Sequence, residues 1–184
     1  MNRACFLPLA LLLIAAAPAP EGAARFTADG KMIAPADYRE WIFLTSGMDM
    51  NYRPGPPMAG HSMFDNVFVN PGAWRVFKAT GHWPEGTVLV KEGYMGSGKG
   101  SITQNGQFQS GEPEGIEAHV LDSKRFKGGW GFFFFASAAP APMIPYTANC
   151  YECHQTHGAT QTTFVQFYPT AKPIAVAHKT YEEK

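Results

Sequence analysis

Two stretches of the chain carry apolar residues at the spacing of an amphipathic helix. The first is residues 35–44, which hold Pro and Asp in the opening turn. Tyr38, Trp41 and Ile42 then fall on one side of a helical wheel. This pattern predicts a first helix over residues 35–44.

The second stretch opens with residues that commonly begin a helix. Asn70 suits the N-cap and Pro71 suits the first helical position, while Gly81 suits the position just beyond the helix. Between them, Trp74 and Phe77 are spaced to form a buried stripe. We therefore predict a second helix between Pro71 and Gly81.

Segments rich in β-branched and aromatic residues alternate with segments rich in Gly, Pro and Asn. The predicted strands are residues 64–70, 86–92, 115–121 and 128–135. The predicted loops and turns are residues 46–60, 96–100 and 105–106. The last strand contains four consecutive Phe and is predicted to be buried on both faces, as core and not as a cofactor site. Successive strands without long strand–helix–strand alternation predict an α+β fold, predominantly an antiparallel β-sheet with two or three packed helices.

The N-terminus has the composition of an export signal. Arg3 precedes an apolar run over residues 6–17, which is shorter than the roughly 20 residues that a membrane span needs. Small residues follow, so residues 1–24 are predicted to be a secretory signal peptide, with cleavage somewhere in 19–25. An uncleaved anchor is the alternative. We expect residues 25–184 to form a single domain, located in the periplasm, with no membrane span once the signal is removed.

Composition narrows the class of protein further. The 184 residues include 15 basic and 15 acidic side chains, so the chain offers no basic surface for nucleic acid. Three cysteines are too few for a disulfide scaffold. Cys5 lies in the predicted signal peptide, which leaves Cys150 and Cys153 in the exported protein.

The chemistry of the chain is concentrated in one motif. Cys150, Cys153 and His154 form the sequence C-x-x-C-H, which is the attachment signal for c-type haem. Two cysteines three residues apart on a helical turn reach the two vinyl groups of one porphyrin edge, and the adjacent histidine binds the iron. The motif therefore predicts one covalent haem c per chain on a C-terminal helix, with His154 as the metal ligand.

Other interpretations of the two cysteines are weaker. A dithiol redox site requires a thioredoxin-like strand–helix–strand setting, which the pattern lacks. A structural zinc site needs four ligands, and Cys150, Cys153, His154 and His157 are too crowded along the chain to close around a metal. A disulfide between Cys150 and Cys153 leaves His154 unexplained.

The position of the motif bears on the sixth iron ligand. Electron-carrying cytochromes c have the motif near the N-terminus and a methionine ligand downstream, whereas no Met follows His154 here. A sixth ligand would have to come from upstream, where the candidates are Met48, Met50, Met58, Met63, His61 and His82. We favour an iron with an open sixth position lined by aromatic residues, which suits ligand binding or catalysis.

The chain resembles the cytochrome P-460 family and its relatives without a haem cross-link, the cytochromes c′-beta, over about residues 26–170. The segments that carry the resemblance are residues 38–41, 67–71, 80–81, 86–92, 115–118, 122–126, 150–154 and 167–169. The resemblance implies an antiparallel β fold with helices, a homodimer and a five-coordinate c-type haem. It further implies one of two functions. Cytochrome P-460 oxidises hydroxylamine, with nitric oxide able to enter the cycle, to nitrous oxide or nitrite, whereas cytochrome c′-beta binds nitric oxide and carbon monoxide at a Phe-capped haem.

Two residues carry the difference between these functions. In cytochrome P-460 a lysine after a Gly-Thr-Val sequence is bonded to the porphyrin, and Lys91 matches that position. Along the strand Lys91 shares a face with Leu89, so it can face a pocket, although a lysine at a strand end is also commonly in solvent. Glu117 is opposite in face to the apolar Ile116 and Ala118, and the resemblance favours it as the carboxylate that relays protons over the haem. An exposed strand residue is the alternative for Glu117.

Phe64 and His61 lie just before Val67, the centre of the predicted strand, and are expected to border the distal pocket. His61 departs from the Phe-capped pattern of the cytochromes c′-beta. Three functions therefore compete: hydroxylamine oxidation at a lysine-cross-linked haem, nitric oxide binding without turnover, and simple electron transfer. Lys91 favours the first, and the missing downstream Met weakens the third. Oxidation also requires a soluble electron-acceptor cytochrome as partner.

Overall fold

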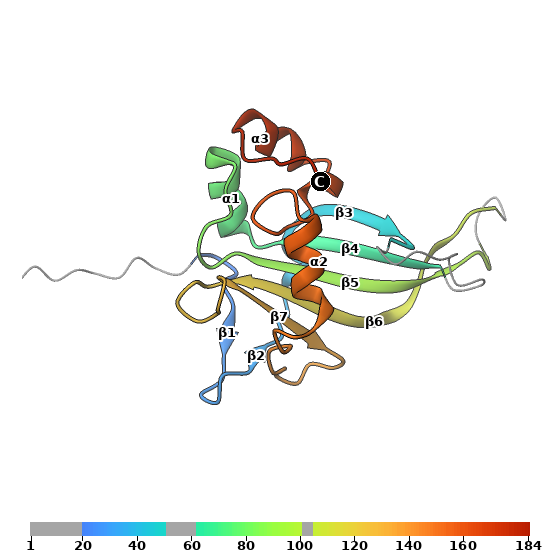
Figure 1. The fold of residues 1–184 in the computed structure, drawn as a ribbon. Coiled ribbons are helices and arrows are strands. Elements are labelled where there is room, and N and C mark those ends of the chain that lie inside the picture. The colour runs from blue at the N-terminus through green and yellow to red at the C-terminus, as the bar shows by residue number, and fades with distance from the viewer. Residues whose placement is uncertain (1–19, 51–61, 101–104) are drawn as a thin grey trace, which may run out of the picture.

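A five-stranded antiparallel sheet forms the centre of the protein, seen here in a computed structural model that describes residues 20–50, 62–100 and 105–184 (Figure 1). Strands that follow one another in the chain are neighbours in the sheet. The strands are β3 (Ile42–Met48), β4 (Met63–Val69), β5 (Val88–Ser97), β6 (Phe108–Leu121) and β7 (Trp130–Phe135), and a separate pair is β1 (Arg25–Phe26) and β2 (Met32–Ile33). The helices are α1 (Pro71–Thr80), α2 (Asn149–His157) and α3 (Lys172–Ala177), with 3₁₀ turns η1 (Tyr38–Glu40) and η2 (Val165–Phe167). The predicted α+β fold with a mostly antiparallel sheet and a C-terminal helix at the motif is confirmed.

Both faces of the sheet are covered, because alternate residues of each strand point to opposite sides. On one face Val88 and Val90 of β5 pack with Phe133 of β7 and with Met32 of β2. On the other face Leu89 belongs to a second core cluster that includes residues of α1, η2 and α3. The second face is also crossed by α2 (Figure 1). The central strands are therefore apolar on both sides over part of their length.

The predicted helix over residues 35–44 is wrong. The chain makes a single 3₁₀ turn, η1, and then extends into β3. Tyr38 and Trp41 pack in one core cluster, whereas Ile42 packs against the cluster on the opposite face of the sheet. Pairing with β4 gives the β-branched and aromatic residues of this segment partners across the sheet, and this long-range pairing overrides the local helical spacing.

The remaining strands agree with the sequence pattern in position and differ at their ends. β5 runs on to Ser97 and β6 begins already at Phe108, so the two form a hairpin longer than the predicted strands at 86–92 and 115–121. The predicted loop at 46–60 is strand as far as Met48, and residues 51–61 lie outside the described residues. Phe134 of β7 is about half exposed, so the expectation of burial on both faces fails there.

Asn70 precedes α1 as predicted, but its side chain does not cap the helix. Its Oδ1 accepts a hydrogen bond from the backbone N–H of Val88 at 2.9 Å, and its Nδ2 donates to the carbonyls of Glu21 and Gly86 at 3.0 and 3.1 Å. The side chain is fully buried. Asn70 therefore joins the start of α1 to β5 and to the N-terminal segment. The other end of α1 follows the prediction, since Gly81 adopts the left-handed conformation that stops the helix.

The N-terminal segment packs on the domain from Pro20 onward. The carbonyl of Glu21 accepts a hydrogen bond from the N–H of Gly72 at 3.3 Å, and a Cβ atom at Gly72 would lie only 2.7 Å from the backbone nitrogen of Glu21. The predicted domain begins at residue 25, so cleavage at the early end of the predicted range 19–25 preserves these contacts. The signal peptide and its cleavage site stay predictions, because residues 1–19 lie outside the described residues.

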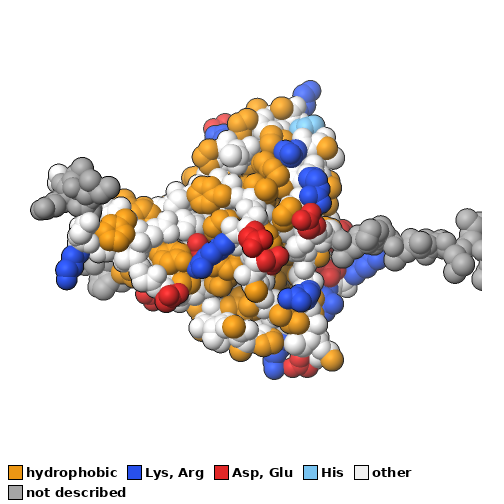
Figure 2. All heavy atoms as spheres, turned by 180° about the vertical axis from the view of Figure 1, so that it is seen from behind, with side chains coloured by type: hydrophobic (Ala, Val, Ile, Leu, Met, Phe, Trp, Pro, Cys, Tyr) orange, Lys and Arg blue, Asp and Glu red, His pale blue; other side chains and the backbone are white. Residues whose placement is uncertain are grey.

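Among the residues that the structure describes, no helix has the length and apolarity needed to cross a membrane. On the face turned away from α2, acidic and basic side chains are interspersed with apolar ones, and neither sign forms a continuous patch (Figure 2). This distribution agrees with the neutral composition.

Candidate functional site

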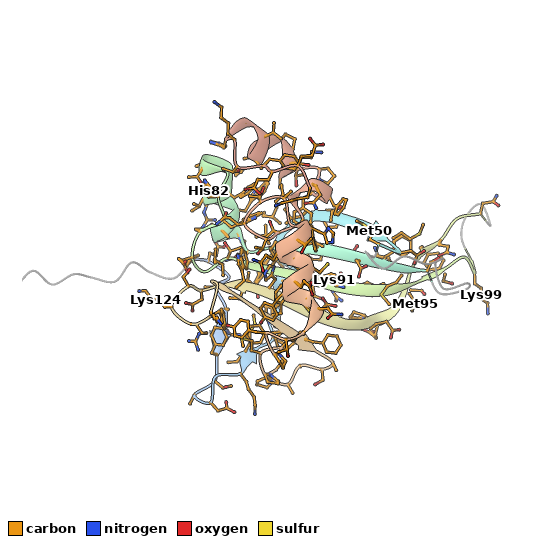
Figure 3. The ribbon with its side chains drawn as sticks, viewed as in Figure 1. Met50, His82, Lys91, Met95, Lys99 and Lys124 are labelled. Atoms are coloured by element: carbon orange, nitrogen blue, oxygen red, sulfur yellow. The ribbon has the colours of Figure 1, made fainter. Side chains whose placement is uncertain are left out.

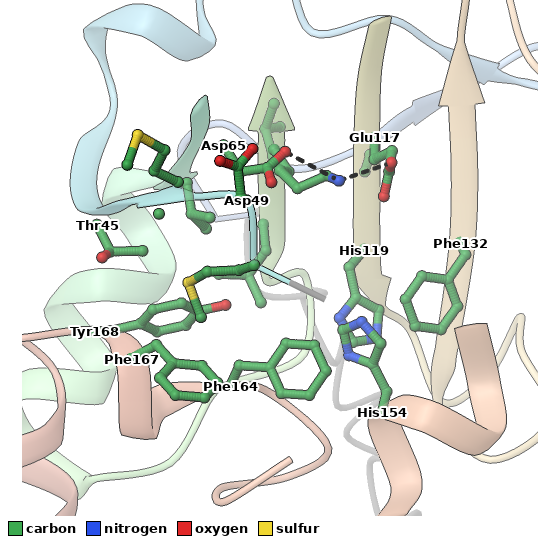
Figure 4. Close-up of a pocket in the computed structure, with 18 residues that line it drawn as sticks. Thr45, Asp49, Asp65, Glu117, His119, Phe132, His154, Phe164, Phe167 and Tyr168 are labelled. Carbon is green, nitrogen blue, oxygen red and sulfur yellow. Dashed lines mark ion pairs between the residues drawn. The ribbon is translucent and has the colours of Figure 1, made fainter. Parts of the chain in front are cut away.

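A cavity of about 440 Å³ lies between the face of the sheet and the C-terminal segment (Figure 4). This volume is within the range of sites that hold cofactors and drug-sized ligands. Charged side chains of both signs line one end of the cavity, and aromatic side chains line the other. The residues that line it are Thr45, Gly47, Met48, Asp49, Met50, Asp65, Val67, Leu89, Val90, Lys91, Glu117, Ala118, His119, Phe132, His154, Phe164, Phe167 and Tyr168.

Helix α2 carries the whole C-x-x-C-H motif. Cys150 and Cys153 are half-buried free thiols, and residues three apart on a helix lie on the same side. His154 follows directly and lines the cavity. The described residues contain no group of three or more His, Cys, Asp or Glu side chains that could hold a metal ion, which argues against the zinc interpretation. The antiparallel sheet likewise lacks the strand–helix–strand unit of a dithiol redox fold.

The ring of His154 is oriented by a hydrogen bond to the backbone. Its Nδ1 lies 2.8 Å from the carbonyl oxygen of Thr162, so Nδ1 carries the proton and donates it. Nε2 is then left with its lone pair, as a metal ligand requires. Burial lowers the pKa of His154 to about 4, against the opposing effect of this hydrogen bond, so the ring is neutral at physiological pH. The structure thus presents His154 in the form that binds iron.

Aromatic rings surround His154 on several sides. The ring of Phe164 lies 4.2 Å away and those of Phe132 and His119 lie 4.7 Å away, measured between ring centroids. Phe132 was expected in the core with its neighbours, whereas it lines the cavity, and Phe133 and Phe135 are in the core. This lining makes the immediate surroundings of the His154 ring apolar.

His119 is a buried polar side chain whose ring nitrogens have no hydrogen-bond partner among the described residues. Its ring lies 4.0 Å from that of Phe132 and 4.1 Å from that of Trp130. Burial lowers its pKa well below the usual value. An unpaired polar group in an apolar wall is costly, so a cavity that contains one is suited to a group that supplies polar contacts.

Lys91 and Glu117 lie together at the other end of the cavity. They are direct partners across β5 and β6, and Nζ of Lys91 is 2.9 Å from Oε1 of Glu117 (Figure 4). Nζ also lies 3.3 Å from Oδ1 of Asp65 on β4. Lys91 lines the cavity, as the face it shares with Leu89 predicts, and Glu117 is about half exposed at its edge.

The charges of this group are coupled. Burial alone would lower the pKa of Lys91, but the carboxylates of Glu117 and Asp65 raise it above the usual value. Burial also raises the pKa of Asp65, and the Lys91 ammonium opposes that rise only in part. Lys91 is therefore protonated in this structure. Sequence reasoning missed Asp65, which shares the cavity face with Val67 by alternation along β4.

The other expected pocket residues are only partly brought to the site. Phe64 does not line the cavity. The aromatic wall of the cavity consists of Phe132, Phe164, Phe167 and Tyr168. Met48 and Met50 line the cavity, whereas His82 lies beside α1, away from Lys91 (Figure 3). Met63 on β4 does not line the cavity, and His61 and Met58 lie outside the described residues.

The residues present fit a haem. A helix offers two thiols three residues apart, and the next histidine turns Nε2 to an aromatic cavity. The buried His119 beside it has ring nitrogens without a hydrogen-bond partner in the part of the chain that the structure describes. Cys150 and Cys153 would hold the ring through their sulfurs, and His154 would bind the iron. Lys91, within β5, lines the same cavity as His154.

Comparison with known families decides the relationship. A family model described as cytochrome P460 matches residues 35–165, which is well over half of the chain. This protein belongs to the cytochrome P460 family. The cytochrome P460 family implies binding of haem c and is generally associated with haem oxidoreductase activity. A search of curated proteins found no match to the chain.

Proposed function

We propose that this member of the cytochrome P460 family oxidises hydroxylamine, with nitric oxide able to enter the cycle, to nitrous oxide or nitrite in the periplasm. The proposal includes a haem bonded to Cys150, Cys153 and Lys91, with His154 on the iron and the sixth position open. The observation that carries it is the place of Lys91: it lines the same cavity as His154, and its amine is held there by ion pairs with Glu117 and Asp65. A lysine that faced solvent instead of the cavity could not reach a haem bound there.

The haem, when bound, supplies an iron that binds a small nitrogen compound and takes up its electrons. The side chains of this chain do the rest. His154 would hold the iron through Nε2, and the backbone carbonyl of Thr162 fixes the orientation of its ring. Phe132 and Phe164 exclude water around this ligand. Lys91, if bonded to the porphyrin, would fix the position of the ring relative to the sheet and change its electronic properties.

Glu117 is placed to take up protons. Combination of one hydroxylamine with one nitric oxide to give nitrous oxide and water releases one proton and one electron, so turnover requires a base near the substrate. The carboxylate of Glu117 lies at the edge of the cavity and is about half exposed, so it can pass a proton from the cavity to solvent. The electron passes to a soluble acceptor cytochrome, which we propose as the partner, and we propose a homodimer as the assembly.

A second candidate function is binding of nitric oxide or carbon monoxide without turnover, as in the cytochromes c′-beta. The observation that favours it is the pair of ion contacts made by Lys91, which hold its amine protonated. A protonated amine has no lone pair for a bond to the porphyrin. The two candidate functions therefore differ in whether Nζ of Lys91 is bonded to the porphyrin or remains a protonated amine.

The optical spectrum of the reduced protein tests the choice between them. A lysine-cross-linked haem is expected to show a Soret band shifted strongly to the red and a green colour, together with electron release from hydroxylamine to an acceptor dye. An ordinary five-coordinate haem c spectrum, with nitric oxide binding and no oxidation of hydroxylamine, would overturn the proposed oxidation in favour of the second candidate.

A further inference from the structure

The amine of Lys91 is held by carboxylates from both neighbouring strands. Glu117 is its direct partner on β6, whereas Asp65 on β4 lies opposite Gly93 and so reaches Lys91 diagonally. Nζ is 2.9 Å from Oε1 of Glu117 and 3.3 Å from Oδ1 of Asp65. The register of three strands therefore determines where the amine is held.

The two carboxylates differ in their exposure to water. The Asp65 side chain is 19% exposed and that of Glu117 is 51% exposed. Solvent weakens ion pairs by screening their charges, so water screens the contact with the less exposed Asp65 less than it screens the contact with Glu117. The side chain of Asp65 also has fewer rotatable bonds than that of Glu117, so less conformational entropy is lost when it is fixed. Glu117 makes the shorter contact with Lys91, whereas Asp65 is the more buried of the two carboxylates.

The carboxylate of Asp65 is partly buried and needs a cation beside it, which Lys91 supplies. Its Oδ1 is buried and makes no well-aligned hydrogen bond within the described residues. A buried carboxylate oxygen in this position is destabilising unless a cation lies beside it, and Nζ of Lys91 does so. Burial raises the pKa of Asp65, so its carboxylate binds a proton more readily than a surface aspartate does. Asp49, the other aspartate at the cavity, instead accepts a hydrogen bond from the N–H of Met63 at 2.8 Å.

We propose that Asp65 is a positioning residue that holds the Lys91 amine at the cavity wall and accepts the proton the ammonium must lose before it bonds to the haem. The inference rests on the proposed function, in which that bond forms. The Lys91 nitrogen first loses one proton to Asp65. On forming its bond to a porphyrin carbon, it loses a second proton and the carbon loses its hydrogen as a proton. The two electrons released, with two protons, reduce a peroxide to two waters.

The test compares haem-bearing peptides from the exported holoprotein and from its Asp65→Asn variant. Asparagine keeps the shape of the side chain and removes the negative charge. We expect haem to remain bonded at Cys150 and Cys153, while the fraction of haem also bonded to the Lys91 peptide falls about tenfold, as does the red-shifted Soret absorbance. Asp65→Glu, which retains a carboxylate, is expected to recover part of the cross-link.

Asp29→Asn is the matched control, because Asp29 is exposed in the turn between β1 and β2 and does not line the cavity, so this variant should cross-link as the parent does. Haem content and far-ultraviolet circular dichroism report whether each variant is folded, and Asp65→Ser is a second uncharged variant should Asp65→Asn not accumulate. Full cross-linking in a folded, uncharged Asp65 variant would overturn the inference and leave the proposed function intact. A parent protein without the Lys91 bond would instead overturn the proposed function, and the role of Asp65 with it.

Discussion

Lys91 and Glu117 are direct partners across β5 and β6, and their charged atoms lie 2.9 Å apart at the wall of the cavity that His154 enters. This pairing joins the residue proposed to bond to the haem with the residue proposed to take up protons. The two roles are chemically separate, because one concerns the chromophore and the other concerns proton transfer. Variants of the two residues should therefore have different effects.

Lys91→Leu is expected to abolish hydroxylamine oxidation and to leave nitric oxide binding in place. Leucine can pack beside Leu89 in the cavity wall, and the haem remains attached through Cys150 and Cys153. The reduced spectrum should become that of an ordinary five-coordinate haem c. Optical titration with nitric oxide and a dye-reduction assay with hydroxylamine measure the two properties. An unchanged spectrum and rate in Lys91→Leu would contradict the role given to this residue.

Glu117→Gln is expected to keep the red-shifted spectrum and to lose turnover. The glutamine still occupies the edge of the cavity but cannot accept a proton, and general-base catalysis commonly contributes about 10²–10⁴-fold to a rate. Steady-state rates at saturating hydroxylamine, compared with the optical spectrum of the same sample, measure the separation. Loss of the spectral shift together with turnover would mean that Glu117 acts on the Lys91 bond.

The iron is expected to lack a strong sixth ligand from the protein. Met48 and Met50 line the cavity, but their side chains are about half exposed and lie at the end of β3. The ferrous protein should therefore bind carbon monoxide readily, and Met48→Leu and Met50→Leu should bind it as the parent does. A ferric electron paramagnetic resonance spectrum that is fully low-spin, and that changes to high-spin in either methionine variant, would identify a methionine ligand and contradict this expectation.

Asn70→Ala is expected to destabilise the domain without removing the haem attachment residues. The substitution leaves the N–H of Val88 and the carbonyls of Glu21 and Gly86 without their partner in a buried setting. The expected loss is about 2–3 kcal/mol in the free energy of unfolding, which corresponds to a fall of roughly 4–12 °C in Tm for a domain of this size. Thermal unfolding followed by circular dichroism measures it. A Tm equal to that of the parent would show that these hydrogen bonds contribute little.

The parts of the fold that follow from local pattern could be predicted from the sequence. The strands at β4 and β7 and the helix α1 are bounded by their own turn and capping residues, such as Pro71 and Gly81. The segment at 35–44 could not be assigned in this way, because its strand form depends on pairing with β4. The long β5–β6 hairpin likewise depends on pairing between Gly-rich segments that carry little local preference.

The residues of the site likewise differ in whether they could be predicted from the sequence. C-x-x-C-H is a local motif, so Cys150, Cys153 and His154 are identified by spacing alone, and Lys91 and Glu117 are identified by resemblance to a family. Asp65 belongs to no motif, and its contact with Lys91 depends on the diagonal register between β4 and β5. The hydrogen bond that orients His154 comes from a backbone carbonyl, which any residue at position 162 would offer, so no side-chain pattern could indicate it.

The mass of the exported protein and of its haem-bearing peptides tests the central claim most directly. The account predicts an intact mass equal to the mature chain plus one haem. It also predicts that digestion releases a single haem-bearing species containing both the peptide with Cys150 and Cys153 and the peptide with Lys91. An intact mass without haem would contradict the cytochrome assignment of the site. A haem-bearing peptide that holds the two cysteines and lacks Lys91 would contradict the cross-link on which the proposed oxidation depends.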